Sequence, residues 1–375
     1  MYILAMPKSD SMNMKAIAVG AVIIVVAATV CAAIIMNNGS KDDKLPTEGI
    51  VITDSLGKEI TIDKTVEKVC IVNSNQAEFF QILDLGDKIS GACQGVFDEP
   101  TLKDGFLTDV TNLGKYNGTG IVENIVKTKV KYVITPTSMG IKAADITTLK
   151  DQYDITCIVL ECYGTTMIQD AEQLVKMFSS NSAKDLLNGY KDLYNSVKNT
   201  VIDKAKEAKV DMSFLAHVAM KGNAFYTDNS ELAKNIESVA GHNSLKEWYT
   251  TIDISETYAR PNAESVAQQS QSVGIDRLIL RSSSSDANLE ATATKFISGF
   301  LKDYASSMTT ISNGNTYVIH TDITSGCRDF IGFVAFAKIF GIETGQDMVK
   351  IANDFNEKYG FKGTYTELLL NYKTP

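Results

Sequence analysis

The chain has 375 residues, a formal net charge of −9 at pH 7 and a sequence pI near 5.0. This acidity, together with the absence of basic stripes in the sequence, excludes nucleic acid as a partner. The chain has only six prolines and an aromatic content of 8%, so its composition is that of a globular protein and not of a disordered one.

The first element in chain order is an uncharged apolar run at residues 16–36, with Lys15 before it and a polar stretch after it. About 20 apolar residues suffice for a helix to cross a bilayer, and the basic flank places the following chain on the outer face. We therefore expect a short tail at 1–15, a single-pass membrane anchor at 16–36 and a linker at 37–48. Two alternatives stay open: cleavage of the segment as a signal peptide, and lipidation at Cys31.

Strands and helices alternate along residues 49–165, which we expect to form an N-terminal α/β lobe. Residues 51–62 have the alternation of a short hairpin, and residues 77–85 have the apolar spacing of a helix. Alternating β and α elements predict a parallel sheet that is covered on both faces. Apolar runs predict its buried strands at 69–72, 89–92, 132–134 and 155–160.

A long helical stretch without proline follows at residues 166–208. Two interpretations are open: a pair of ordinary surface helices, or a pair whose second helix connects two lobes. The α/β pattern then restarts and fills residues 209–375, the expected C-terminal lobe. Its predicted strands lie at 214–217, 225–227, 278–280 and 316–320, and its predicted helices at 229–241, 289–301 and 330–340.

The predicted fold class is therefore α/β. We expect two α/β lobes with central, mostly parallel sheets, joined by a long connecting α-helix and preceded by an N-terminal transmembrane helix. In such an architecture the ligand cleft lies between the lobes, at the carboxyl ends of the strands.

The six cysteines have no CxxC spacing, and Cys157 lies in an apolar, strand-like run. We therefore expect buried free thiols, with a Cys157–Cys162 disulfide as the alternative. The three histidines, His217, His242 and His320, are too scattered for a metal site, so no bound metal is predicted.

Several motifs occur in a defined order along the chain after residue 49. The hairpin VITDSLGKEITI is followed by VEKVCIVNSNQAEFFQILDLGDKISGAC. Further motifs are VENI and KYVI (122–125 and 131–134), AGHN (240–243), AESV and DRLI (263–266 and 276–279), and ISNGNTYV (311–318). This order resembles the ABC-transporter substrate-binding proteins that capture ferric siderophores, haem and vitamin B12. One departure is that Val130-Lys131 and Ile275-Asp276 replace the family's usual Pro-Asp before a buried strand.

The resemblance implies a receptor and not an enzyme: the extracellular substrate-binding component of an ABC importer. The implied partners are permease subunits with an ATPase, and the protein itself would be a monomer without a cofactor. The implied ligand is a small-molecule metal chelate, with a ferric siderophore or another iron complex as the first choice and a corrinoid or haem as alternatives. The rival classes are a surface protein without a transport role and an anchored extracellular enzyme, although GxSxG, HExxH and P-loop signatures are absent from the sequence.

Two glutamates match the positions at which this family docks onto its permease. There, one glutamate on the surface of each lobe pairs with permease arginines, in a contact that fixes orientation. The resemblance thereby assigns permease docking to Glu123 and Glu264. The structural alternative is an acidic residue that stabilises the first turn of a helix.

The candidate ligand contacts follow predicted strands or lie in a segment that faces the predicted cleft. Aromatic side chains offer apolar contact to a macrocycle or a catecholate ring, and arginines pair with carboxylates or with the charge of a ferric chelate. Helix capping, core packing and surface salt bridges are the structural alternatives. The candidates are Asn73, Ser74, Asn75, Thr137, Ser138, Trp248, Tyr249, Tyr258, Arg260, Arg281 and Arg328.

Overall fold

The structure is a computed structural model that describes residues 49–63, 66–218, 224–245, 257–272, 274–282 and 288–373. All of these residues belong to one compact unit, residues 48–375. The predicted tail, anchor and linker lie outside the described residues. Within the described residues, none of the helices is both long enough and apolar enough to span a membrane.

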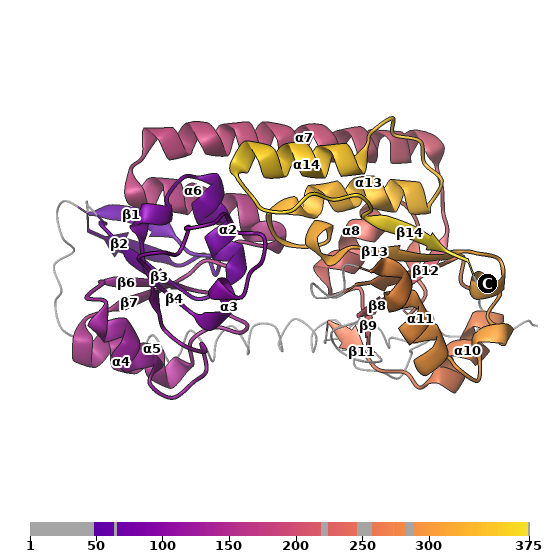
Figure 1. Ribbon diagram of the computed structural model, residues 1–375, viewed down its shortest axis with the longest axis horizontal. Coiled ribbons are helices and arrows are strands. Elements are labelled where there is room, and N and C mark those ends of the chain that lie inside the picture. Colours follow the sequence, from indigo (N-terminus) through magenta and orange to yellow (C-terminus); the bar gives the residue numbers. More distant parts are fainter. Residues whose placement is uncertain are drawn as a thin grey trace, which may run out of the picture. The chain divides into compact units, whose positions relative to one another are not determined.

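The first sheet, within residues 66–160, has five parallel strands in the order β5-β4-β3-β6-β7 (Figure 1). Alternate residues of its central strand enter two hydrophobic clusters, Val69 and Ile71 one of them and Cys70 the other. Both faces of the sheet are therefore buried, as the sequence pattern predicts. The strands are β3 (Val69–Ile71), β4 (Ile89–Ala92), β5 (Thr111–Asn112), β6 (Tyr132–Thr135) and β7 (Thr156–Val159).

The predicted hairpin precedes this sheet as β1 (Ile50–Thr53) and β2 (Glu59–Ile62), which pair antiparallel. The carboxylate of Asp54 closes the turn, since it accepts hydrogen bonds from the backbone N–H groups of Leu56 at 3.0 Å and Lys58 at 2.9 Å. The helices of this region are α2 (Ser74–Ile82), η1 (Gly86–Lys88), α3 (Gln94–Phe97), α4 (Ile121–Lys127) and α5 (Ala143–Tyr153).

Helix α2 begins at Ser74, ahead of the predicted start at Ala77. The reason is a capping box. The Oδ1 atom of Asn73 accepts from the backbone N–H of Gln76 at 3.0 Å, and the Gln76 side-chain oxygen accepts from the backbone N–H of Asn73 at 3.2 Å. The box satisfies helix donors that would otherwise lack a partner, so the helix starts at its polar cap and not at its first apolar residue.

The long helical stretch consists of two helices, α6 (Met167–Phe178) and α7 (Asn181–Ala208), after a short turn η2 (Gly164–Thr166). With 28 residues, α7 is about 42 Å long. The ring centroid of Tyr190 on α7 lies 5.4 Å from that of Phe79 on α2 and 6.4 Å from that of Phe330. Phe330 belongs to α13 (Asp329–Ile339), a helix of the second α/β region. Helix α7 thus packs against elements from both α/β regions.

A second sheet follows α7, with the order β11-β9-β8-β12-β13-β14 in the described residues and β10 paired with β8. Strands β8, β10, β12 and β13 pair in parallel, whereas β9, β11 and β14 join antiparallel. The sheet is therefore parallel at its centre and antiparallel at its edges. The strands are β8 (Ser213–Val218), β9 (Ala224–Tyr226), β10 (His242–Asn243), β11 (Tyr258–Ala259), β12 (Arg277–Arg281), β13 (Thr316–Ile319) and β14 (Leu369–Tyr372).

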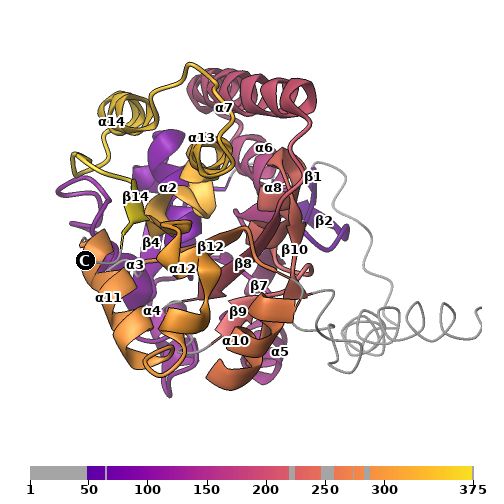
Figure 2. The ribbon, with the colours of Figure 1, turned by 90° about the vertical axis from the view of Figure 1, so that its right-hand side faces the viewer.

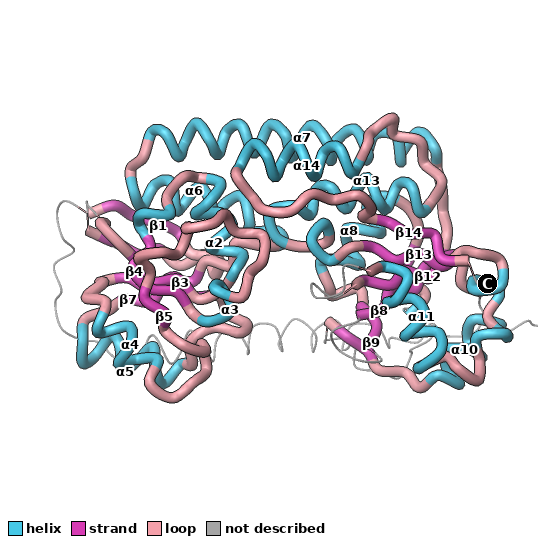
Figure 3. The backbone as a smooth tube through the Cα atoms, in the orientation of Figure 1, coloured by secondary structure: helices cyan, strands magenta, loops and turns pink. Residues whose placement is uncertain are grey.

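Helix α13 (Asp329–Ile339) is buried on nearly every side. Figure 2 shows it beneath α7 and α14 (Met348–Tyr359), and the helices stand out from the strands in Figure 3. Such a position explains why its sequence is apolar all round. The other helices that the structure describes in this region are α8 (Glu231–Val239), α10 (Ala263–Ser272), α11 (Leu289–Gly299), η4 (Ala305–Ser307), α12 (Thr309–Ser312), η5 (Thr321–Ile323) and η6 (Gly326–Arg328).

Candidate ligand-binding site

Arg281 is the last residue of β12, at the carboxyl end of a central parallel strand. Its three guanidinium nitrogens donate hydrogen bonds to hydroxyl oxygens: Nε to Thr324 at 2.7 Å, Nη1 to Tyr226 at 2.8 Å and Nη2 to Ser325 at 2.9 Å. The side chain is half-buried. Because these acceptors are neutral, none of them offsets the guanidinium charge, which can pair with an anionic group as far as the described part of the chain shows.

Tyrosine side chains gather beside this guanidinium. The ring centroids of Tyr226 and Tyr258 lie 5.6 Å apart on neighbouring strands of the second sheet. Tyr163 lies in the loop after β7 of the first sheet, where burial raises its pKa and the neighbouring Glu161, Tyr258 and Glu231 act in the same direction. A Cβ atom added at Gly164 would lie 3.1 Å from Cγ of Glu231. The loop after β7 therefore meets the second α/β region here.

The loop after β6 carries Thr137, Ser138 and Met139, all of them exposed. The backbone N–H of Thr137 donates to Oε1 of Glu161 at 2.8 Å, and the Thr137 hydroxyl donates to the same oxygen. The hydroxyls of Ser138 and Tyr163 lie 3.4 Å apart. Met139 is 67% exposed with a φ of 56°, which bulky residues rarely adopt. This loop is thus tied to the loop that bears Tyr163.

The N-terminus of α2 supplies Asn73, Ser74 and Asn75, all half-buried. Asn73 caps α2, which is the structural role given above as the alternative to ligand binding. Asn75 faces the second α/β region, because a Cβ atom added at Gly326 would lie 3.0 Å from its Oδ1 atom. Asn75 therefore lies beside the loop whose Ser325 accepts from Arg281, and Ser138 lies beside Tyr163. Tyr258 packs on Tyr226, which also accepts from Arg281.

Arg328 occupies a different environment from the other candidates. It is only 2% exposed, and its Nη2 donates to Oε1 of Glu78 at 2.7 Å and to the Thr101 hydroxyl at 3.1 Å. Its guanidinium carbon lies 4.7 Å from the ring centroid of Phe361. The guanidinium is committed to a buried ion pair between α2 and η6, so we leave Arg328 out of the candidate ligand site.

The remaining candidates lie outside this group. Trp248 and Tyr249 fall outside the described residues. Arg260 is exposed directly after β11. Glu123 and Glu264 are exposed in the first turns of α4 and α10, respectively. Both glutamates are therefore accessible to a protein partner.

Within the described residues, no group of three or more His, Cys, Asp or Glu side chains is arranged to hold a metal ion. Burial lowers the pKa of His320, whose ring centroid lies 5.5 Å from that of Tyr365. The five described cysteines are free thiols, and the prediction that they are buried is confirmed for all of them except the half-buried Cys157: Cys70, Cys93, Cys157, Cys162 and Cys327.

Solved structures share this arrangement of sheets and helices. FepB, a TroA-like periplasmic binding protein from Veillonella parvula, aligns with a TM-score of 0.67 and 16% identity, covering 86% of this chain and 99% of its own. The fold is that of the TroA-like periplasmic binding proteins. The molybdate periplasmic binding protein MolA from Haemophilus influenzae, bound to molybdate, aligns with a TM-score of 0.63 and 13% identity, over 84% of this chain and 99% of its own.

A periplasmic heme binding protein from Pseudomonas aeruginosa aligns with a TM-score of 0.53 and 11% identity, over 74% of this chain and 93% of its own. No family model and no curated protein matches the sequence. The resemblance inferred from the ordered motifs is thereby confirmed at the level of the TroA-like fold.

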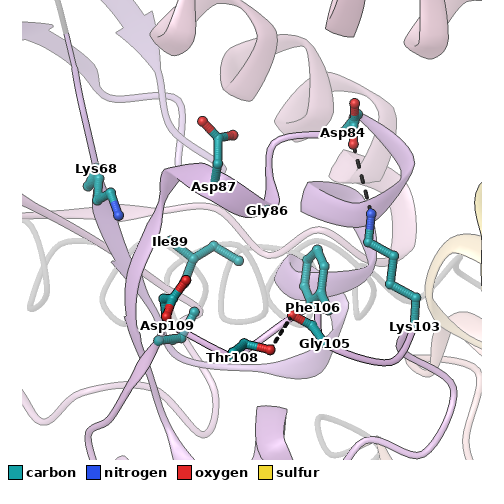
Figure 4. A pocket seen from close by; sticks show the side chains of 11 residues that line it. Lys68, Asp84, Gly86, Asp87, Ile89, Lys103, Gly105, Phe106, Thr108 and Asp109 are labelled. Atoms are coloured by element: carbon teal, nitrogen blue, oxygen red, sulfur yellow. Dashed lines mark hydrogen bonds and ion pairs between the residues drawn. The ribbon is translucent and has the colours of Figure 1, made fainter.

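The chain also has a hollow of about 450 Å³ in its first α/β region, shown in Figure 4. Its lining includes Lys68, directly before β3, and Ile89, the first residue of β4. These are the amino ends of parallel strands, whereas ligands of such sheets bind at the carboxyl ends. Its charged groups also neutralise one another, as in the pair of Lys103 and Asp84 at 3.9 Å. We therefore do not assign the ligand to this hollow.

Sequence reasoning missed two tyrosines of the site. Tyr163 follows the predicted strand at 155–160, so the rule that selected the loop after β6 would also have selected it. Tyr226 lies within the predicted strand at 225–227 and reads as core. Its hydroxyl group accepts from Arg281 because β9, which bears Tyr226, pairs antiparallel with β8. The sequence pattern does not predict that pairing.

A buried carboxyl group directly follows Arg328 in the sequence. Asp329, the first residue of α13, is buried, and its Oδ1 atom has no hydrogen-bond partner among the described residues. Burial raises the pKa of Asp329 from 3.8 to about 7, although the nearby Lys198 acts in the opposite direction. The folded protein therefore holds this proton across a pH range in which an unfolded chain has released it.

We expect stability to fall as the pH rises from about 4 to about 7, because the folded state then binds one more proton than the unfolded state. The slope from this group is at most about 1.4 kcal/mol per pH unit. Asp329→Asn should flatten the profile in that window, whereas Asp203→Asn, at an exposed site on α7, should not. Urea unfolding between pH 4.5 and 7.5 measures the difference, and parallel profiles for the wild type and Asp329→Asn would contradict the assignment.

Proposed function

We propose that this protein is the substrate-binding component of an ABC importer and captures a small-molecule metal chelate outside the cell. The observation that carries the proposal is Arg281, a guanidinium held by three neutral hydroxyl groups at the carboxyl end of a central strand of the second sheet. An anionic group of the ligand would pair with it, and Tyr226 and Tyr258 would contact the organic part. The fold shared with periplasmic binding proteins supports the same class of function.

In this proposal the two sheets are the cores of an N-terminal lobe at 49–165 and a C-terminal lobe at 209–375. Residues 166–208 connect them, and because α7 packs against both, the lobes close only modestly around the ligand. Residues 16–36 anchor the body on the outer face of the membrane. The protein acts as a monomer, and ATP hydrolysis belongs to its partner chains.

The ligand is a ferric siderophore or another iron complex in our first choice, with a corrinoid and then haem as alternatives. All three would place an organic, partly conjugated surface against the tyrosines. Tyr163 and Tyr226 join the proposed contacts and Arg328 leaves them. The others are those predicted from the sequence: Asn73, Ser74, Asn75, Thr137, Ser138, Trp248, Tyr249, Tyr258, Arg260 and Arg281.

The test is a thermal-stability titration of the full-length chain in detergent with several ferric siderophores, cobalamin and haemin, and with molybdate as a simple oxyanion. A ligand at about 100 times its Kd should raise stability by about 2.7 kcal/mol. A saturable shift with one chelate supports the proposal and selects the class. The absence of a shift with all of them would turn the assignment toward another small ligand or toward one of the rival classes.

Once a chelate binds, Arg281→Gln should weaken its affinity by about 10- to 100-fold, because a hydrogen bond to a charged group is lost. Arg277→Gln is the matched control. Arg277 lies at the amino end of the same strand, and its Nε atom donates to the carbonyl oxygen of Ile339 at 2.8 Å. Isothermal titration calorimetry measures both variants, and equal losses of affinity would remove Arg281 from the site.

A further inference from the structure

Residues Thr324–Arg328, here called the docking loop, hold Arg281 through two side chains. The Thr324 hydroxyl accepts from Nε of Arg281 at 2.7 Å, and the Ser325 hydroxyl accepts from Nη2 at 2.9 Å. The Thr324 hydroxyl in turn donates to the carbonyl oxygen of Thr321 at 2.8 Å. Its own proton is therefore directed away from the guanidinium, which leaves its lone pairs to accept.

The other side of the docking loop rests on α2 of the first α/β region. Gly326 has a φ of +67°, and a Cβ atom there would lie 2.8 Å from Oε2 of Glu78 and 3.0 Å from Oδ1 of Asn75. The backbone N–H of Cys327 lies 3.5 Å from the same Glu78 oxygen, and Nη2 of Arg328 donates to Oε1 at 2.7 Å. One carboxylate thus contacts three successive residues of the loop.

The connecting helix fixes the loop from a third direction. The hydroxyl group of Tyr190 on α7 donates to the carbonyl oxygen of Cys327 at 2.9 Å. Tyr190 and Cys327 are both fully buried. The docking loop therefore has little freedom to move as long as it stays seated on Glu78.

We infer that Glu78 and Gly326 are positioning residues for Arg281: they seat the docking loop on the first α/β region, and the seated loop orients the guanidinium. Neither residue needs to touch the ligand. The role of Arg281 as a ligand contact rests on the proposed function, whereas the orientation of its guanidinium does not. The two claims can therefore be tested separately.

The test uses the reaction of arginine with phenylglyoxal, followed by mass spectrometry of the full-length chain. The chain has four arginines, at 260, 277, 281 and 328, so fragment spectra can assign each modification to its own position. Because the Glu78 carboxylate is held by its buried pair with Arg328, the Cβ of Gly326→Ala should displace the loop from it. The modification rate of Arg281 should then rise about tenfold, since two hydrogen bonds to a charged group are loosened. The rate at the exposed Arg260 should not change.

Gly341→Ala is the matched control. Gly341 lies at the end of α13 with a φ of +73°, and a Cβ atom there would meet nothing within 4 Å. It therefore carries the same backbone strain without a collision, and the Arg281 rate should stay at the wild-type value.

Glu78→Gln is the second variant, and it decides the question if Gly326→Ala does not fold. Its amide oxygen can still accept from Arg328, but its NH₂ group cannot accept from Cys327, so the Arg281 rate should lie between those of the wild type and Gly326→Ala. A folded variant of either kind with an unchanged Arg281 rate would overturn the inference. Because this assay needs no chelate, it remains decisive even if every chelate in the titration fails to bind.

Discussion

Glu78→Ala is expected to lower the free energy of unfolding by about 3–5 kcal/mol, because it leaves the guanidinium of Arg328 buried without its carboxylate. Glu78 is 6% exposed and Arg328 is 2% exposed, so water cannot replace the lost partner. A loss of this size is a large share of the roughly 5–15 kcal/mol that stabilises an ordinary domain. Urea unfolding of the full-length chain, followed by circular dichroism, measures it.

The matched control is the double variant Glu78→Met with Arg328→Met. Replacing both members of a buried ion pair by apolar side chains of similar volume is often neutral or stabilising, since the desolvation cost of both charges disappears. We therefore expect the double variant to unfold near the wild-type midpoint. If Glu78→Ala were as stable as the wild type, the pair would be hydrated in solution and the two regions would not be joined through it.

The Glu78–Arg328 pair also marks the limit of what the sequence could predict. The two residues are 250 positions apart, and nothing in the local pattern of either one indicates the other. Arg328 was predicted as a ligand contact because it precedes an apolar helix. In the fold, the same position buries its side chain between η6 and α2. Pairings between distant segments require the folded chain, so burial separated Arg328 from Arg281 where residue type could not.

Local patterns, by contrast, contained most of the elements. The strand at 89–92 and the hairpin at 51–62 appear as predicted, because short apolar runs and alternation are direct consequences of burial on one or two faces. Helix α14 was missed although its signal is present: Asp347 caps it, Gly360 ends it, and its buried residues recur at helical spacing.

The edge strands are a different case. Strand β14 pairs antiparallel with β13, and β11 pairs antiparallel with β9, each over few residues. Their sequences are too short for a period to be read, and the alternating β/α pattern carries no information about which edge a late strand joins. Tyr226 and Tyr258 face each other across such a pair, so the aromatic part of the site also depended on the structure.

Charge reversal at Glu123 or Glu264 is expected to reduce import of the chelate strongly while leaving its capture intact. Both carboxylates are exposed in the first turns of α4 and α10, and neither belongs to the group around Arg281. An arginine at either position would meet the permease arginines that the family resemblance implies, and juxtaposed like charges cost several kcal/mol at an interface. We therefore expect uptake to fall by at least about tenfold in Glu123→Arg and in Glu264→Arg, measured with a radiolabelled chelate in cells that carry the permease.

The control for this experiment is Glu357→Arg, an equally exposed glutamate on α14, which packs beside α7 (Figure 1). It changes the net charge by the same amount. A loss of uptake that occurs only in Glu123→Arg and Glu264→Arg therefore cannot come from the change in net charge. Calorimetry on each variant must give the wild-type chelate affinity, because the ligand site is untouched. If uptake survives both reversals while Arg281→Gln abolishes it, the chain captures the ligand as proposed but meets its permease through another surface.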